Sequence, residues 1–214
     1  MPDGRTQVVA ISRPVALADA ERISAFRKSK LPGVDGIWVF ITGDLVMFMI
    51  YFLVFTTGRM EAPAAYDLGR RQLDPLIGCA LTLILLTSSW LVVRAVEAAR
   101  EGSSGRVRTN LLLAMLLGTG FAGLKAFGYV HDALAGHSPS SNPFFGYYYA
   151  ITGIHCMHVM LGMGLLLICY VKASKPIDDK YVLWIESGAC FWHMVDMLWV
   201  LLFPMFYLLR SGVL

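Results

Sequence analysis

The sequence predicts an all-α integral membrane protein, a bundle of five transmembrane helices. Of its 214 residues, 57% have hydrophobic side chains and 15% have charged ones, which is more apolar surface than one soluble domain can bury. A hydrocarbon core about 30 Å thick requires roughly 20 apolar residues per helical crossing. Five stretches reach this length, at about residues 34–57, 76–98, 108–130, 146–171 and 181–209.

A polar leader precedes the first of these stretches. We assign residues 1–33 to a cytoplasmic leader and residues 34–214 to the transmembrane domain. The leader lacks the apolar core of a secretory signal, so we expect it to be retained. Within it, apolar residues recur at helical spacing beside basic ones, at Leu17, Ala20, Ile23 and Phe26. This pattern fits either a short amphipathic helix on the membrane surface or an ordinary solvated helix.

The distribution of lysine and arginine predicts the orientation. Outside the spans, the leader has six of them and the second and fourth loops have three each, whereas the first loop has three and the carboxyl-terminal end has one. Positive residues are retained on the cytoplasmic side of a membrane. We therefore expect the amino terminus inside and the carboxyl terminus outside. The net charge of +3 is explained by this asymmetry and does not indicate a nucleic-acid partner.

Six ionisable residues fall inside the predicted spans, and they form our candidate buried polar network. One is Asp44 in the first helix, and the others lie in the fourth and fifth helices: His155, His158, Glu186, His193 and Asp196. Each such residue costs about 2.5–3.5 kcal/mol at a helix centre unless it is paired or faces the bundle interior. We therefore expect all six to point inward.

Helical spacing predicts how the groups on the last two helices meet. Glu186 and His193 lie seven residues apart, two turns along one face, and His193 and Asp196 are adjacent on the helix surface. His155 and His158 similarly share one side of the fourth helix. The loop between these helices has roughly ten residues, which favours antiparallel neighbours. Imidazoles and carboxylates are then expected to satisfy one another between the two helices.

Several roles are compatible with these groups. They can act only as interhelical hydrogen-bonding groups that fix the register of the bundle. A metal site is disfavoured, because the His-x-x-His pattern has no second ligand-rich pair. Haem ligation is disfavoured as well, because it needs histidines that face each other across helices, and the short spacing of His155 and His158 suits this poorly. A proton path through Asp44, Glu186 and His193 would make the chain an independent transporter. The residues alone leave these alternatives open.

Three motifs in separate helices resemble one known family. These are "GDLVMFMIYF" at residues 43–52, "TGIHCMHVMLG" at residues 152–162 and "ESGACFWHMVDMLWVLLF" at residues 186–203. In this order they are similar to the helices of subunit III of the haem-copper cytochrome c and quinol oxidases, in its five-helix form. The resemblance extends from about Gly36 to the carboxyl terminus.

Two residues depart from the family pattern. Asp44 stands where a buried glutamate is usual, and Gly128 in "LKAFGY" stands where a glutamate usually precedes the tyrosine. The short length and the run "WHMVDMLWVLLFPMFYLL" at residues 192–209 most resemble the branch that accompanies bacterial nitric oxide reductases, the NorE type.

The resemblance implies a non-catalytic accessory subunit, multi-pass in the inner (cytoplasmic) membrane. Such a subunit binds no haem or metal directly, packs against a catalytic haem-bearing subunit that holds them, and carries structural phospholipid. The chain also lacks a nucleophile paired with a base and a phosphate loop, which agrees with that role. Within this family picture, His193 pairs with Asp196, while Glu186 and either His155 or His158 brace the fourth helix against the fifth.

Two further hypotheses concern individual residues. Burial without a cation close in sequence would keep Asp44 neutral, so we expect it to act as a protonated donor or to assist proton or gas access to the partner. Candidate lipid-binding residues lie near the ends of the first two spans, where they can meet a lipid phosphate or anchor the interface: Trp38, Arg70, Arg71 and Arg94.

Overall fold

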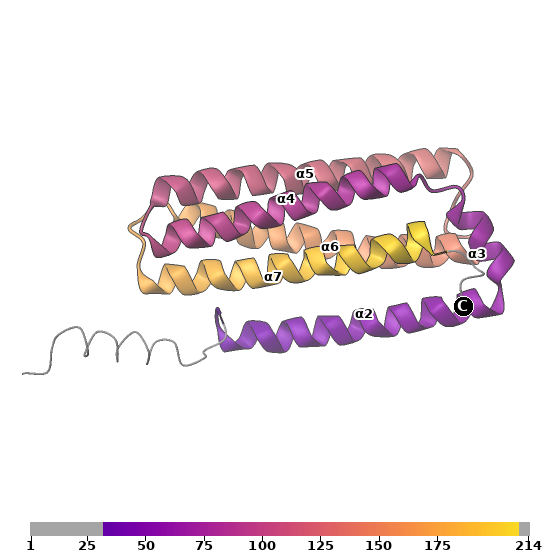
Figure 1. Ribbon diagram of the computed structural model, residues 1–214, viewed down its shortest axis with the longest axis horizontal. Coiled ribbons are helices and arrows are strands. Elements are labelled where there is room, and N and C mark those ends of the chain that lie inside the picture. Colours follow the sequence, from indigo (N-terminus) through magenta and orange to yellow (C-terminus); the bar gives the residue numbers. More distant parts are fainter. Residues whose placement is uncertain (1–31, 210–214) are drawn as a thin grey trace, which may run out of the picture. The chain divides into compact units, whose positions relative to one another are not determined.

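The computed structural model describes residues 32–209, so the leader helix expected around residues 17–26 lies outside the described part. Within residues 32–209 the secondary structure is helical, and five helices are long and apolar enough to cross a membrane. Figure 1 shows these helices, which are α2 (Asp35–Glu61), α4 (Pro75–Arg100), α5 (Ser104–Leu134), α6 (Pro143–Lys172) and α7 (Asp179–Phe203). The predicted fold class is confirmed, while the orientation of the termini stays a prediction.

Three helices begin before the apolar stretches from which they were predicted, at polar residues that cap them. Asp74 accepts a hydrogen bond from the Leu76 amide, Asn142 from the Phe144 amide and Asp178 from the Tyr181 amide. Such side chains satisfy the amides that a helix start leaves without an intrahelical partner. The helices are therefore longer than their apolar cores. At its other end, α7 continues into the π-helical turn η1 (Pro204–Leu208).

A short helix, α3 (Pro63–Arg70), lies in the loop after α2, where the sequence suggested no element. It has eight residues, too few for the length criterion that identified the spans. Its Tyr66 is 3% exposed. A Cβ added to Gly69 would lie 2.5 Å from the Phe144 ring, so the glycine permits close packing of α3 against the start of α6.

Helix α7 forms the centre of the bundle. It packs against both α4 and α6, and α5 in turn packs against α4 and α6. The predicted contact between the fourth and fifth spans, α6 and α7, is therefore confirmed. Trp192 of α7 is fully buried, and a Cβ added to Gly162 of α6 would lie only 2.7 Å from its ring. A residue without a side chain is thus needed where α6 crosses this indole.

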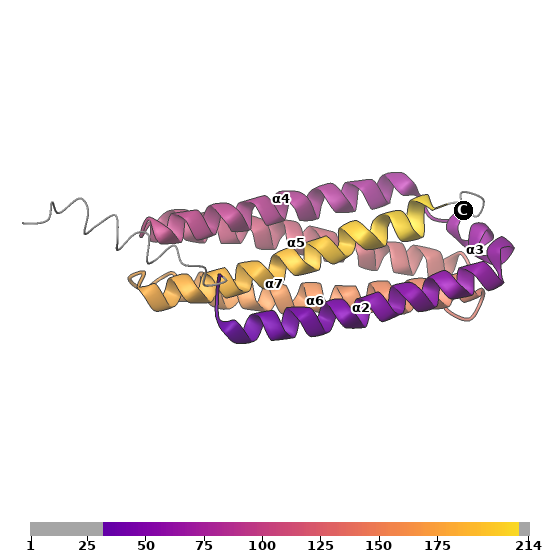
Figure 2. The same cartoon turned by 60° about the horizontal axis from the view of Figure 1, so that its bottom comes forward.

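Helix α2 is the least covered of the five spans. It contacts α6 and α7, and its apolar window is 11% buried, against 56% for α7. The two views show α4 and α5 together on one side, with α7 between them and α2 (Figures 1 and 2). Contacts at a few positions of α2 therefore determine how it is held.

Candidate functional site

The six ionisable residues expected in one network divide into separate sites. The first site joins α2 to α6. Asp44 Oδ2 lies 3.3 Å from His158 Nε2, and the two side chains are 13% and 7% exposed. His158 Nδ1 lies 2.9 Å from the carbonyl oxygen of Ile154. Because a carbonyl oxygen only accepts, Nδ1 carries a proton and Nε2 is left to face the acid. Asp44 Oδ2 is buried and lies within ion-pair distance of Nε2, but it forms no hydrogen bond within residues 32–209.

The second site joins α4 to α7. His193 Nδ1 lies 2.6 Å from Ser89 Oγ and 3.7 Å from Asp196 Oδ2. The predicted proximity of His193 and Asp196 is present, but the contact across helices is made by Ser89, which sequence reasoning missed. Serine is common in transmembrane helices, so nothing in the sequence distinguished Ser89 from its neighbours. The Asp196 carboxylate is buried and has no hydrogen-bond partner among residues 32–209.

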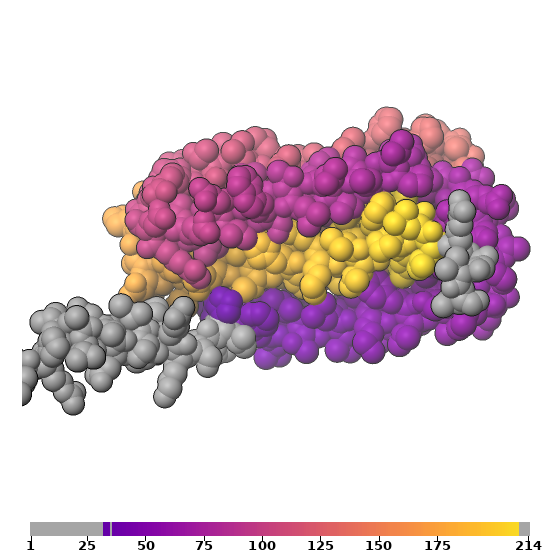
Figure 3. Space-filling model, in the orientation of Figure 1, coloured from indigo at the N-terminus to yellow at the C-terminus, as the bar shows by residue number. Residues whose placement is uncertain are grey.

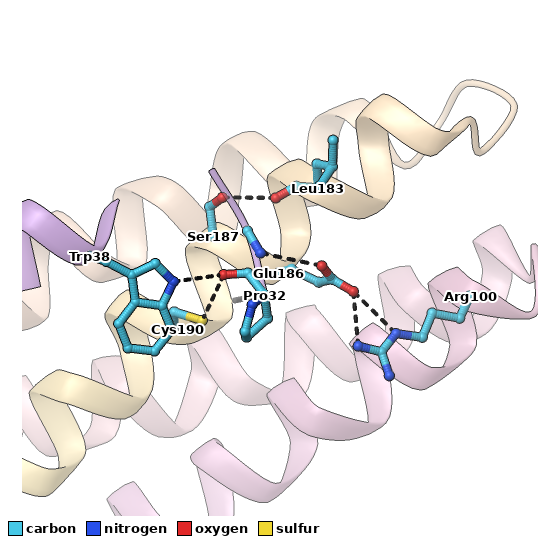
Figure 4. Close-up of polar contacts among 8 residues, drawn as sticks. Pro32, Trp38, Arg100, Leu183, Glu186, Ser187 and Cys190 are labelled. Atoms are coloured by element: carbon cyan, nitrogen blue, oxygen red, sulfur yellow. Dashed lines mark hydrogen bonds and ion pairs between the residues drawn. The ribbon is translucent and has the colours of Figure 1, made fainter. Parts of the chain in front are cut away.

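The third site lies near the amino-terminal end of α7, at Glu186. Arg100, the last residue of α4, directs Nη2 and Nε to Glu186 Oε1 at 2.8 and 3.2 Å. The Gly33 amide donates to the other carboxylate oxygen at 3.3 Å. Figure 4 shows this carboxylate between the arginine and the segment that precedes α2. The expectation that Glu186 braces α6 through His155 or His158 is therefore wrong.

The position of Glu186 along α7 explains the error. Seven residues correspond to about 10 Å of helix, so Glu186 lies well away from the depth of His193. At that level the end of α4 and the chain before α2 are closer than the histidines of α6. Spacing within one helix gave the shared face, but it could not give the neighbour at each depth.

His155 is buried among aromatic rings and does not pair with a carboxylate. It has no exposed surface, and neither ring nitrogen has a hydrogen-bond partner within residues 32–209. Its ring stacks on Trp199 at 5.3 Å between centroids and meets the edge of Phe121 at 5.9 Å. The expected pairing of His155 with a carboxylate is also wrong.

Lys125 is a buried lysine that sequence reasoning missed. It is 2% exposed, its Nζ lies 2.7 Å from Tyr148 Oη, and the same nitrogen lies 4.3 Å from the Tyr148 ring centroid. The rings of Tyr129 and Trp199 lie slightly farther away, at 5.0 and 5.2 Å. No carboxylate lies within ion-pair distance in the described part of the chain.

A sequence signal for Lys125 existed. Lys125 lies within a predicted span and continues the apolar face of α5. That face recurs every three or four residues, through Val107, Leu111, Ala114, Gly118 and Phe121. A lysine on such a face points inward.

The candidate lipid-binding residues lie in different surroundings. Trp38 Nε1 donates to the Pro32 carbonyl at 3.0 Å, as Figure 4 shows. Arg70 is largely buried and reaches the Tyr207 carbonyl at 3.5 Å. Arg94 is exposed and pairs with Glu97 at 3.3 Å, and Arg71 is exposed. Arg71 and Arg94 are therefore the accessible cations of this set.

The described residues contain no cluster of three or more histidine, cysteine, aspartate or glutamate side chains that could hold a metal ion. The four cysteines are free thiols.

Comparison with known proteins identifies the family. The pattern of the family described as "Cytochrome c oxidase subunit III" matches residues 29–211. The chain belongs to the cytochrome c oxidase subunit III family. Cytochrome c oxidase subunit 3 of Bacillus subtilis (strain 168) is 27% identical over 194 residues, covering 90% of this chain and 92% of that protein. Quinol oxidase subunit 3 of the same organism is 26% identical over 181 residues, covering 83% and 87%.

Similar coverage extends to other subunit III proteins. Cytochrome c oxidase subunit 3 of Alkalihalophilus pseudofirmus is 27% identical over 186 residues, which cover 83% of this chain and 86% of the relative. The subunit III family thus spans all five membrane helices of this chain. An independent transporter is not favoured by these findings.

Proposed function

We propose that this chain is the non-catalytic accessory subunit of a haem-copper-type respiratory complex and assembles with a larger haem-bearing membrane subunit. The family match across residues 29–211 carries this proposal. The polar contacts support it, since Arg100 engages Glu186 and His158 engages Asp44 within the bundle itself. These contacts hold helices together, as expected of a subunit that supports a redox neighbour.

Purification of the tagged chain from its native membrane in mild detergent tests this function. We expect a larger haem-bearing subunit to accompany it, with a visible haem spectrum, and we expect the chain expressed alone to be colourless. Proton or solute uptake by vesicles that contain only this chain would contradict the proposal.

We further propose that the complex is a nitric oxide reductase of the NorE-associated type. The support is the short length and the run at residues 192–209. The curated relatives described above are cytochrome c and quinol oxidase subunits, so the substrate must be measured. The purified complex should consume nitric oxide faster than dioxygen at equal concentrations, and the reverse preference would assign it to the oxidases.

A structural phospholipid is the third part of the proposal. Arg71 and Arg94 are exposed cations near the ends of their spans, where lipid phosphates lie. Native mass spectrometry of the intact complex should show retained phospholipid that falls in Arg71→Gln or Arg94→Gln. Unchanged retention in both variants would leave these arginines as interface anchors.

Asp44 is proposed to do more than hold α2. Its carboxylate is buried 3.3 Å from the His158 imidazole, and either group can hold a proton. We propose that Asp44 supplies this proton, or eases access of a proton or gas, to the haem-bearing subunit.

A further inference from the structure

One face of α7 lies between α4 and α2, and from His193 toward Leu201 it is left uncovered. It consists of residues three or four apart, which we call the α7 strip: Cys190, His193, Met197, Val200 and Leu201. His193 contacts Ser89 of α4, and Cys190 approaches the Pro32 carbonyl just before α2 at 3.8 Å, so the strip lies between those two helices. Figure 3 shows α7 visible along this line. The apolar members Met197, Val200 and Leu201 are 50%, 40% and 48% exposed.

The strip has a polar centre. The His193 side chain is 37% exposed, and although Nδ1 is engaged by Ser89, Nε2 has no hydrogen-bond partner among residues 32–209. His193 is also at mid-span, since it lies about 21 Å along the helix from Asp179, in a span of 30 residues. An imidazole nitrogen here faces the hydrocarbon unless another molecule covers it.

The depth of His193 decides what can cover it. Phospholipid headgroups lie at the ends of the span, and acyl chains offer no hydrogen-bonding group. Polar side chains at this depth face protein or a water-filled cavity. Another transmembrane helix with a polar side chain can satisfy Nε2 and cover the apolar members of the strip at the same time, as polar residues do between membrane helices.

We infer that the α7 strip is the docking surface for a transmembrane helix of the haem-bearing subunit, with His193 Nε2 hydrogen-bonded to a polar side chain of that helix. This inference rests on the proposed function, which supplies the partner. The Ser89 hydroxyl and the Asp196 carboxylate, 3.7 Å from Nδ1, orient the ring. Ser89 is flanked by Leu86 and Val93, which are 47% and 41% exposed and extend the apolar surface onto α4.

The docking surface is bounded at one end. The Pro32 carbonyl accepts from Trp38 Nε1 and lies over Cys190, as Figure 4 shows, so the chain before α2 covers the strip there. The partner helix therefore contacts α7 from His193 toward Leu201. The two sides of the strip differ, with apolar α4 residues on one side and α2 on the other.

Variants of His193 test the hydrogen bond. In the complex purified from native membranes, His193→Leu should lower the haem retained per tagged chain by about three- to tenfold, the effect of one interhelical hydrogen bond in a membrane. His193→Gln should retain most of it, because an amide can still bond across the interface. His131→Leu is the matched control, because this histidine lies near the carboxyl-terminal end of α5 and its side chain is 72% exposed. The control variant should retain haem as the unmodified chain does.

Thermal unfolding of the same variants expressed without the partner separates docking from folding. His193→Leu also loses the contact with Ser89, so it should unfold a few degrees below the unmodified chain and no further, the effect of one hydrogen bond. Equal haem retention in His193→Leu would overturn the inference. The inference would also be overturned if the unfolding temperature fell far enough for instability of the chain to account for the loss of haem, because His193 would then act inside the bundle.

Crosslinking provides a second readout in a chain that keeps His193. A photoreactive phenylalanine analogue at Met197 or Val200 should link the chain to the haem-bearing subunit, and the same analogue at Leu116, 59% exposed on α5, should not. Adducts from Leu116 alone would overturn the α7 strip and leave the accessory function intact. If no haem-bearing subunit accompanies even the unmodified chain, the accessory function fails, and the docking inference fails with it.

Discussion

Asp44 on α2 and His158 on α6 lie 3.3 Å apart, and this contact is the mid-span polar link between the least covered helix and the rest of the bundle. The edge of Phe48 meets the imidazole at 5.6 Å and Phe191 stacks near it at 6.4 Å. The aromatic rings shield the pair from lipid. A charge or a proton shared by the two groups is therefore held in a dry environment, where electrostatic interactions are strong.

Asp44→Asn should preserve assembly and lower turnover of the complex. Asparagine keeps the size of the side chain and a hydrogen-bonding group toward His158, but it cannot release a proton. The measurement is substrate consumption per haem in complexes with equal subunit content. Turnover equal to that of the unmodified complex would reduce Asp44 to a helix contact, and Asp44→Glu, which restores the acid usual in the family, should keep activity.

Glu186→Gln should destabilise the chain by about 1 kcal/mol. The variant leaves Arg100 without its carboxylate, but Arg100 is 59% exposed, so solvent screens much of the pair. The matched control is Glu97→Gln on α4, whose pair with Arg94 is 51% and 55% exposed and should change stability by less than about 0.5 kcal/mol. Unfolding in detergent measures both, and equal effects would show that the Gly33 amide and the burial of Glu186 add nothing.

Gly128→Glu should stabilise the chain through Lys125. A Cβ at Gly128 meets nothing within 4 Å, and three residues along a helix bring a glutamate toward the lysine. The glutamate gives Lys125 a carboxylate partner, and none lies within ion-pair distance of it among residues 32–209. Gly128→Ala separates the gain in helix propensity, about 1 kcal/mol, from the effect of the charge.

The double variant completes this test. If the pair forms, the advantage of Gly128→Glu over Gly128→Ala should disappear in a Lys125→Met background. An advantage that persists without the lysine would show that the new acid acts on another group.

Tyr66→Phe should make the protein more resistant to alkali. Tyr66 lies on α3, outside the spans, and burial raises the pKa of its hydroxyl to about 12, with Tyr147 and Glu61 adding to the shift. The fold favours the neutral hydroxyl of Tyr66. The contribution of this hydroxyl to the free energy of unfolding is complete below the ordinary pKa near 10 and is lost as the pH rises through 12. Between pH 10 and 12, the unmodified chain should lose up to about 1.4 kcal/mol per pH unit relative to Tyr66→Phe. Parallel stability curves for the two proteins over this range would contradict the prediction.

The sequence predicted the spans well because length and apolar density are properties of each segment alone. It also predicted that His193 and Asp196 meet, since both lie on one helix. The partners of Asp44 and Glu186 depend on the rotation and depth of neighbouring helices, which spacing within a single helix does not determine. Lys125 was overlooked because counting charges by loop ignored the helical face on which it lies.

Helix α2 is fastened at its ends. At its start, the Val34 backbone amide donates to Ser187 Oγ. Beyond its end, the side-chain Nδ2 of Asn142, the cap residue of α6, donates to the Ala65 carbonyl of α3 at 2.9 Å. These bonds do not involve the outward side chains of α2, such as Val39 and Leu53, which are 77% and 57% exposed. Substitutions on this outer face can therefore adapt the helix to a thicker bilayer or to an extra neighbouring subunit without breaking the bonds at its ends.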